Sequence, residues 1–444
     1  MPRRPFVPCC LLTSSLALGL TGCANLKKFQ PVPLSAQDTA AILQQRTLSS
    51  LGIDPRQPVA FSALAQAAMT HHPEVELARR EADEARAAIL SAGARPNPTV
   101  NLLPTRVTPQ KMTSPWLASF SLDFPIETAG KRCKRVLQAQ QQANAAALRV
   151  ADTAWQVRAK LRTAWLDLFA AEQRASLLAT QLATQEQMVE ALDARLKAGE
   201  SSRGEMMQSR LLLNQTRLLA SGAKKSAAEG RSGLASAIGV PAAQLASARF
   251  HFAPAMNPRK NLKPSQLRCS AYLERPDVLA ALSDYAAAEA TLRLEIAKQY
   301  PDLRLGPGYE FDQGLNKWSL GFSLTLPVFD RNQGPIAEAE AKRATSAARF
   351  QVLEARVAGD LDRALASYRG ALEKLQVAGE TVTDATNQRD AAQRLLQGGE
   401  GDRLSVLAAQ VELDAALAGR LDVLVEVQQA LAGIEDATRT ALEP

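Results

Sequence analysis

The residues of this chain that could carry chemistry are few, and they do not form a catalytic set. His71 and His72 precede a proline and have no cysteine or acidic residue at metal-ligand spacing, which favours a helix start over a metal site. Met206 and Met207 could touch a soft metal, but adjacent helical residues point in different directions, which favours packing. No nucleophile, base and orienting residue can be assembled. We therefore expect no enzyme activity, no cofactor and no metal site.

Residues 129–135 carry a second group of reactive side chains. Ala129-Gly130-Lys131-Arg132 suggests a phosphate loop, but Pro125 holds the position of the first glycine of that motif, which argues against one. Cys133 lies among basic residues that could activate its thiol, although a spectator thiol is favoured. We expect the basic side chains to orient the start of a helix, near lipid headgroups or neighbouring carboxylates; they are Lys131, Arg132, Lys134 and Arg135.

The N-terminal residues have the order of an export signal. Arg3 and Arg4 precede an apolar segment that ends in Leu20-Thr21-Gly22-Cys23. This segment is too short for a retained membrane helix. The cysteine at the predicted cleavage site resembles the lipobox of bacterial lipoproteins, which implies a covalent diacylglycerol lipid on Cys23. In that family, aspartate after the cysteine is the usual signal for the inner membrane, so Ala24 favours sorting to the outer membrane. A plain signal peptide with a chance cysteine is the alternative.

The composition suits long, closely packed helices. Aromatic residues make up 5% of the 444 residues, and alanine is abundant. The net charge is +7, but basic residues alternate with 45 acidic ones and no aromatic-basic cluster resembles a nucleic-acid-binding module, so nucleic acid is not an expected partner. Cys133 and Cys269 could form one disulfide at most. No run of about 18 apolar residues follows Cys23, so any membrane crossing must be made by strands.

The chain contains one unit twice, at an offset of about 200 residues. His72-Pro73-Glu74-Val75 recurs as Arg275-Pro276-Asp277-Val278, and Phe124-Pro125-Ile126 recurs as Leu326-Pro327-Val328. A Gly-Glu turn ends a helical stretch in each half. We divide the chain into a signal peptide (1–22), a lipidated linker (23–58), a first repeat (59–240), a proline-containing connector (241–269), a second repeat (270–440) and a tail (441–444).

Each repeat is predicted to run helix, strand pair, very long helix, turn and returning helix. The strands around 116–124 and 318–326 alternate between an apolar face and a face of small or polar residues. This pattern fits a tilted bilayer crossing or an amphipathic sheet on a soluble core. Residues 130–199 include no proline, and apolar residues recur among them at alternating spacings of four and three. This pattern predicts a coiled-coil helix about 105 Å long. Four strands cannot close a barrel, so the sheet packs on something or several chains contribute strands.

These features together resemble the TolC family of outer-membrane efflux channels. The resemblance rests on Pro96-Asn97-Pro98 before the first strand, on the Gly-Glu turns and on two strand-to-helix junctions. The second junction is similar to that of heavy-metal members such as the Czc and Cus outer-membrane components. The junction residues are Gly130, Lys131 and Arg132 in the first repeat, and Asp330, Arg331, Asn332 and Gly334 in the second.

The resemblance implies a mainly α protein with a membrane β-barrel portion. Three chains would each give four strands to one twelve-stranded barrel, and their long helices would form a coiled-coil tunnel in the periplasm. A periplasmic adaptor (membrane fusion protein) and an inner-membrane pump of the resistance-nodulation-division (RND) type are the implied partners. The expected function is a passive, lipid-anchored outer-membrane conduit, with heavy-metal cations as the leading substrate. Export of drugs, organic toxicants or secreted proteins is the alternative, and a periplasmic coiled-coil structural or adaptor lipoprotein is a more distant one.

The resemblance also implies a periplasmic entrance just after the second glycine turn, where family members commonly carry acidic residues. The aligned positions here are Ser405 and Ala408, which departs from an acidic gate. Glu400 and Asp402 lie within a turn of this place, and Glu205 occupies the matching position of the first repeat. A ring of carboxylates would favour cations. The alternative for each acid is a solvated charge that suits a helix start.

Overall fold

The computed structural model describes residues 29–106, 116–259, 262–312 and 314–442. The chain divides into two units, Met1–Arg46 and Thr47–Pro444. The described part of the first unit contains helix α2 (Ala36–Gln44), which begins after Ser35, whose hydroxyl accepts hydrogen bonds from the amides of Gln37 and Asp38. The lipidation candidate Cys23 and the predicted signal peptide lie outside the described residues.

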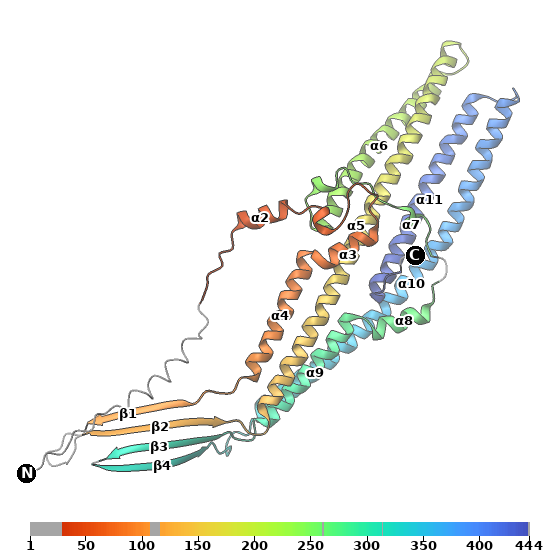
Figure 1. Ribbon diagram of the computed structural model, residues 1–444. Coiled ribbons are helices and arrows are strands. Elements are labelled where there is room, and N and C mark those ends of the chain that lie inside the picture. Colours follow the sequence, from red (N-terminus) through yellow and green to blue (C-terminus); the bar gives the residue numbers. More distant parts are fainter. Residues whose placement is uncertain (1–28, 107–115, 260–261, 313, 443–444) are drawn as a thin grey trace, which may run out of the picture. The chain divides into compact units, whose positions relative to one another are not determined.

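The second unit repeats one order of elements (Figure 1). The first repeat contains α3 (Phe61–His71), α4 (Pro73–Gly93), β1 (Thr99–Arg106), β2 (Trp116–Ile126), α5 (Lys131–Lys197) and α6 (Arg203–Ile238). The second contains α8 (Pro264–Leu273), α9 (Pro276–Ala297), β3 (Leu303–Asp312), β4 (Leu315–Leu324), α10 (Gln333–Gln397) and α11 (Arg403–Thr438). Short 3₁₀ turns η2 (Ser49–Leu51) and η3 (Ala242–Leu245) and helix α7 (Ala253–Met256) complete the described elements. The predicted internal repeat is confirmed in this order.

The strands form one antiparallel sheet in the order β1-β2-β3-β4. Phe120 pairs with Tyr309, and Tyr309 pairs with Trp318, so aromatic side chains cross three strands in one row. Along β2, exposed Trp116, Phe120 and Phe124 alternate with less exposed neighbours, as the sequence pattern predicted. Gly308 lies opposite Ser319, where a Cβ would come within 2.7 Å of the serine hydroxyl, so a larger residue here would require the serine side chain to turn away.

None of the helices in the described part of the chain covers this sheet. It lies beyond the ends of α4, α5, α9 and α10 rather than against their sides (Figure 1). All of β4 is exposed, and large apolar side chains of the sheet, such as Trp318 and Phe322, are 81% and 67% exposed. The alternative of an amphipathic sheet packed on this chain's own soluble core is therefore wrong. An apolar sheet face left open by its own chain needs another apolar environment.

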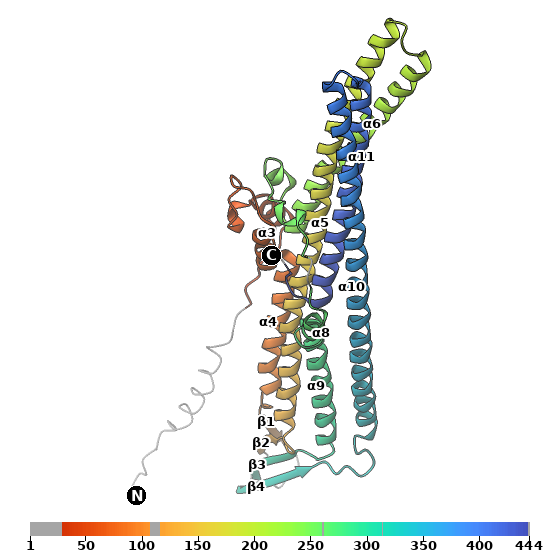
Figure 2. The same cartoon turned by 90° about the vertical axis from the view of Figure 1, so that its right-hand side faces the viewer.

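The helices are as long as the sequence predicted: 67 residues in α5 and 65 in α10. Helix α5 packs against α4, α6, α9 and α11, while α10 packs against α9 and α11 (Figure 2). Seam residues Leu161, Leu168 and Leu192 are buried, and the polar interruption Gln185 is buried with them. None of the described helices is both long and apolar enough to span a membrane.

Two apolar clusters hold the unit together. One gathers around Trp165 and Phe169 of α5, with Phe61 of α3 and Phe252 of the connector in ring contact. The other joins α8, α10 and α11 through Leu361, Tyr368, Ile434 and their neighbours. Above these clusters the helix pairs α5–α6 and α10–α11 run on as hairpins (Figure 2). The cores thus lie at the base of the hairpins, where bulky side chains are concentrated.

Candidate functional site

The first strand-to-helix junction is built around a carboxylate from the second repeat. Lys131 Nζ lies 2.7 Å from Asp302 Oδ1, and the Thr128 amide donates to the same oxygen at 2.9 Å. Ala129 and Gly130 both adopt left-handed backbone conformations, which reverse the chain between β2 and α5. Burial opposes ionisation of Asp302, but the hydrogen bonds from Lys131 and Thr128 hold the pKa of this carboxyl below its ordinary value. The strand pairs of the two repeats are thereby fastened together at this junction.

The other basic residues of this junction contact α4. Arg132 Nε donates to the Gly93 carbonyl at 2.6 Å, and Arg135 donates to the carbonyls of Ala92 and Ala94 at 3.3 Å. Cations at these carbonyls satisfy the open C-terminus of α4. Arg135 also forms an ion pair with Glu127. Lys131 and Arg135 therefore contact neighbouring carboxylates, which is one of the two surroundings that the sequence left open for these basic residues.

The second junction uses an asparagine where the first uses a glycine. Asn332 has a φ of 62° and precedes α10, as Gly130 precedes α5. Its Nδ2 donates to the carbonyl of Glu295 at 2.7 Å and to the Glu295 carboxylate at 3.0 Å, which binds α10 to the end of α9. Asp330 accepts from the Asn332 amide at 2.8 Å, while Arg331 and Gly334 lie exposed. Asparagine is one of the few residues other than glycine that adopt the left-handed region readily.

At the tip of the first hairpin, Glu205 closes a capping box. Its Oε2 accepts from Ser201 Oγ at 2.7 Å and from the Ser202 amide at 3.1 Å, while Ser202 Oγ accepts from the Glu205 amide. These bonds, first that from Ser201, lower the pKa of the Glu205 carboxyl. Among the predicted entrance residues, Glu205 therefore has the local role of a helix-start charge.

At the tip of the second hairpin, Asp402 is the residue before α11 and pairs with the other hairpin. Its Oδ2 lies 2.6 Å from Arg195 Nη1, near the end of α5, and Glu200 lies 3.7 Å from the same guanidinium. Ser405 Oγ donates to the Asp402 carbonyl at 2.6 Å. Glu400 is exposed and Ala408 half-buried. The structure thus brings Asp402 and Ser405 together, and the sequence reasoning missed Arg195, which links the two tips.

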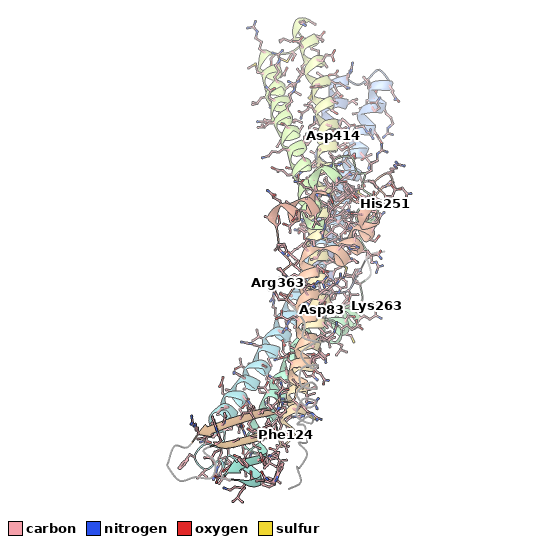
Figure 3. The ribbon with its side chains drawn as sticks, turned by 60° about the vertical axis from the view of Figure 1, so that its left-hand side comes forward. Asp83, Phe124, His251, Lys263, Arg363 and Asp414 are labelled. Atoms are coloured by element: carbon pink, nitrogen blue, oxygen red, sulfur yellow. The ribbon has the colours of Figure 1, made fainter. Side chains whose placement is uncertain are left out.

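Further from the tips, α5 and α11 share a buried carboxyl that the sequence did not single out. Asp414 is 3% exposed and accepts from Gln410 Nε2 at 2.8 Å, and its Oδ2 lies 3.4 Å from Thr184 Oγ1 of α5. Burial raises the pKa of Asp414. Asp414 is labelled in Figure 3, and it borders a groove of about 930 Å³ between α5, α6 and α11. The buried Gln185 beside Thr184 was the available signal, because it interrupts an otherwise apolar seam.

The histidines, methionines and cysteines that the sequence offered as reactive residues have ordinary structural environments. His72 precedes α4 and its Nδ1 accepts from the Glu74 amide at 3.2 Å, which confirms the helix-start reading. Met206 is buried, whereas Met207 is 66% exposed. Cys133 and Cys269 are free and exposed. Within the part of the chain that the structure describes, no three His, Cys, Asp or Glu residues gather as a metal site would require.

The chain matches known proteins over most of its length. The model of the family described as "Outer membrane efflux protein" matches residues 64–240 and 267–438. The cobalt-zinc-cadmium resistance protein CzcC of Cupriavidus metallidurans is 26% identical over 405 residues, which cover 89% of this chain and 94% of CzcC. The pyoverdine export outer membrane protein OpmQ of Pseudomonas putida is 26% identical over 263 residues, 56% of this chain and 54% of OpmQ.

Solved structures share the fold. A crystal structure of CusC superposes with a TM-score of 0.68 at 16% identity, covering 93% of this chain and 99% of CusC. The two segments matched by the family model, 64–240 and 267–438, correspond to the two repeats seen in the structure. This chain therefore belongs to the outer membrane efflux protein family, as an outer-membrane efflux channel with the TolC-like fold.

Proposed function

We propose that this channel is the outer-membrane component of a tripartite efflux system that exports heavy-metal cations. The observation that carries this proposal is the similarity to CzcC, a cobalt-zinc-cadmium resistance protein, along nearly the whole length of both chains. In this proposal the protein is a passive conduit, and an RND-type pump in the inner membrane and a periplasmic adaptor deliver the substrate.

The proposed assembly is a homotrimer with a twelve-stranded barrel. The four-stranded sheet has two edges, β1 and β4, with no partner strand among the described residues. Edges exposed to lipid are not tolerated, and about eight strands are the minimum for a closed outer-membrane barrel. Pairing β4 of one chain with β1 of the next removes every edge and gives the exposed apolar side chains a bilayer to face. A lipid on Cys23 would add an anchor, and a Cys23→Ser variant that kept its acyl label would rule the anchor out.

The hairpin tips support a conduit rather than a selective filter. The predicted entrance acids Glu205, Glu400 and Asp402 are accompanied by Arg203 and Arg403, the first residues of the returning helices. Arg195 neutralises Asp402 directly. Carboxylates balanced by cations create little net field, so in our proposal the pump sets the choice of substrate.

The test is growth of a deletion strain, with and without the restored gene, on zinc, cobalt, cadmium, copper and silver salts and on dyes, detergents and antibiotics. Metal sensitivity that the restored gene reverses is expected. Sensitivity to organic compounds alone would overturn the metal assignment and favour organic export, for which the partial similarity to OpmQ is the precedent. Single-channel conductance of the purified protein in planar bilayers tests the pore itself, and an absence of conductance would favour the structural lipoprotein.

A further inference from the structure

The sheet and the helices meet in four short segments, which we call the junction belt. They are residues 93–98, 125–135, 295–303 and 325–335. Each segment joins a helix to a strand, and all four lie at the sheet end of the helices (Figure 2). The belt contains seven basic and four acidic residues. It therefore holds three of the seven excess positive charges of the chain.

The acids of the junction belt are already satisfied by its own residues. Three of them form ion pairs: Glu127 with Arg135, Glu295 with Lys298, and Asp302 with Lys131. The fourth, Asp330, accepts a hydrogen bond from the Asn332 amide. Four basic residues have no carboxylate partner within the described part of the chain; they are Arg95, Arg132, Lys134 and Arg331. The excess charge of the belt belongs to these four side chains.

These four cations can still bind an anion. Arg95 and Arg331 are exposed, and neither side chain forms an ion pair or a hydrogen bond with any residue that the structure describes. Arg132 is exposed and Lys134 is half-buried, and each donates to a backbone carbonyl at 2.6 Å. A neutral carbonyl does not compensate the charge of a guanidinium or an ammonium group, whereas a phosphate does.

Apolar side chains are exposed in the same belt. Phe329 is 95% exposed, and Leu326 and Val328 beside it are exposed as well. They follow β4, whose Trp318 and Phe322 are also exposed, so the apolar surface of the sheet continues into the belt. Exposed apolar side chains next to cations suit a membrane interface, where the apolar groups enter the acyl region and the cations reach the phosphates.

The position of the junction belt determines which membrane surface it meets. In the assembly proposed above, the sheet lies in the outer membrane and the helices lie in the periplasm. The belt between them then lies at the inner leaflet of that membrane, which consists of phospholipids. The end of β4 and the start of β1 are both at the helix end of the sheet. Pairing β4 of one chain with β1 of the next therefore joins the belts of the three chains into one ring.

We propose that the junction belt binds the phosphate groups of anionic phospholipids in the inner leaflet. Arg95, Arg132, Lys134 and Arg331 contact the headgroups, while Phe329 enters the acyl region beside them. Four cations per chain exceed what one phosphate requires, so the partner is a lipid surface rather than a single bound molecule. This inference rests on the proposed membrane position of the sheet, but it is independent of the exported substrate.

The experiment measures which phospholipids stay with the full-length protein. The protein in non-ionic detergent is equilibrated with equal amounts of phosphatidylglycerol and phosphatidylcholine that have the same acyl chains, and the lipid that remains after removal of free lipid is quantified by mass spectrometry. We expect phosphatidylglycerol to be enriched in the wild type, and less so at high salt, because salt screens exposed charges. A basic residue near an anionic surface strengthens binding about fivefold, so Arg95→Gln/Arg331→Gln should lower the enrichment by about 5- to 25-fold.

The matched control removes two exposed cations elsewhere. Lys224→Gln/Arg249→Gln changes one residue of α6 and one of the connector, and it should keep the lipid ratio of the wild type. Equal retention of the two lipids by the wild type would overturn the proposal. So would an unchanged ratio in Arg95→Gln/Arg331→Gln, or an equal loss of enrichment in the control.

A further variant separates the apolar contact from the charges. Phe329→Ser should lower the total amount of both lipids that is retained and leave their ratio unchanged, and an unchanged total would show that Phe329 does not enter the bilayer. Conductance separates this inference from the proposed function. A wild type that conducts without enriching phosphatidylglycerol overturns the lipid contact alone, whereas a wild type that does not conduct overturns the conduit.

Discussion

Adding one methyl group at Gly401 should disrupt the tip of the second hairpin. A Cβ built on Gly401 would lie 2.6 Å from the Leu396 nitrogen and 2.8 Å from the Leu395 carbonyl carbon. Both are backbone atoms, so no side chain can turn away to make room. The amides of Glu400 and Gly401 both donate to the Leu395 carbonyl at 3.0 Å, and this pair of bonds draws the turn onto the end of α10. Gly401→Ala must therefore break or lengthen these bonds.

The expected cost is about 1–3 kcal/mol of local stability, the usual range for forced overpacking. Since every 1.4 kcal/mol is a factor of ten, opening of the tip should become roughly 5- to 140-fold more frequent. Gly398→Ala is the matched control in the same turn. Its Cβ would meet the carbonyl oxygens of Arg394 and Leu395 at 3.5 and 3.6 Å, which is ordinary contact, and its φ of −77° suits alanine. The first repeat has Ala198 at this position.

Hydrogen exchange of the tip amides is the suitable assay, because a hairpin end opens locally without global unfolding. Peptides covering residues 395–402 should exchange faster in Gly401→Ala, and those covering 195–202 should not change. In Gly398→Ala the same amides should exchange at the wild-type rate or more slowly. Equal exchange in Gly401→Ala and wild type would refute the argument that the backbone approach at this turn requires glycine.

Three further variants test a buried carboxyl, a carboxyl at the first junction and a helix cap. Burial raises the pKa of Asp414. The stabilisation that this carboxyl contributes is therefore full below the ordinary aspartate pKa of about 3.9, and it is lost as pH rises through the raised pKa. Asp414→Asn should raise the thermal midpoint of the protein at neutral pH and make that midpoint less dependent on pH. The pKa of Asp302 is lowered, so Asp302→Asn should cost about 1.5 kcal/mol at neutral pH through the weakened Lys131 bond, and a difference in midpoint that does not shrink in acid would contradict this. Ser202→Ala removes half of the capping box and should cost about 1 kcal/mol, read as faster amide exchange in the first turn of α6 alone.

The sequence located the strands and long helices because their signals are local. Alternation along β2 and the apolar seam of α5 follow from how side chains project from a strand and from a helix. Neither pattern depends on distant residues, so each could be read from a short stretch of sequence. The same patterns were compatible with two environments for the sheet, a bilayer and a soluble core. The structure decided between them, since none of the described helices packs on the sheet (Figure 1), in which Trp318 is 81% exposed.

The junctions were found in the sequence, but their partners were not. Lys131 and Asn332 stood out because each lies between a strand and a helix. Their partners, Asp302 and Glu295, are 171 and 37 residues away along the chain and belong to the second repeat. A single sequence cannot pair such residues, because the Lys131 pair depends on how the two repeats fold against each other and the Asn332 pair on how α10 packs against α9.

At the hairpin tips, the sequence again predicted only the contacts between residues close together in the chain. The Ser202 and Glu205 spacing is that of a capping box, which follows from helix geometry alone. The pairing of Arg195 with Asp402 joins two hairpins and carries no local signal. The role of the predicted entrance residues in gating stays a prediction, to be tested by conductance of variants at Asp402.

The sequence by itself determined the repeat, the order of elements and the length of the helices, because periodicity, caps and glycine turns act over a few residues. Tertiary structure alone decided which charges meet. It buried Asp414 between α5 and α11, fastened Lys131 to Asp302 and gathered Arg162, His251 and Arg259 around one cavity. The physical reason is that burial and electrostatic pairing depend on distances in space, and these are set only once the two repeats have packed together.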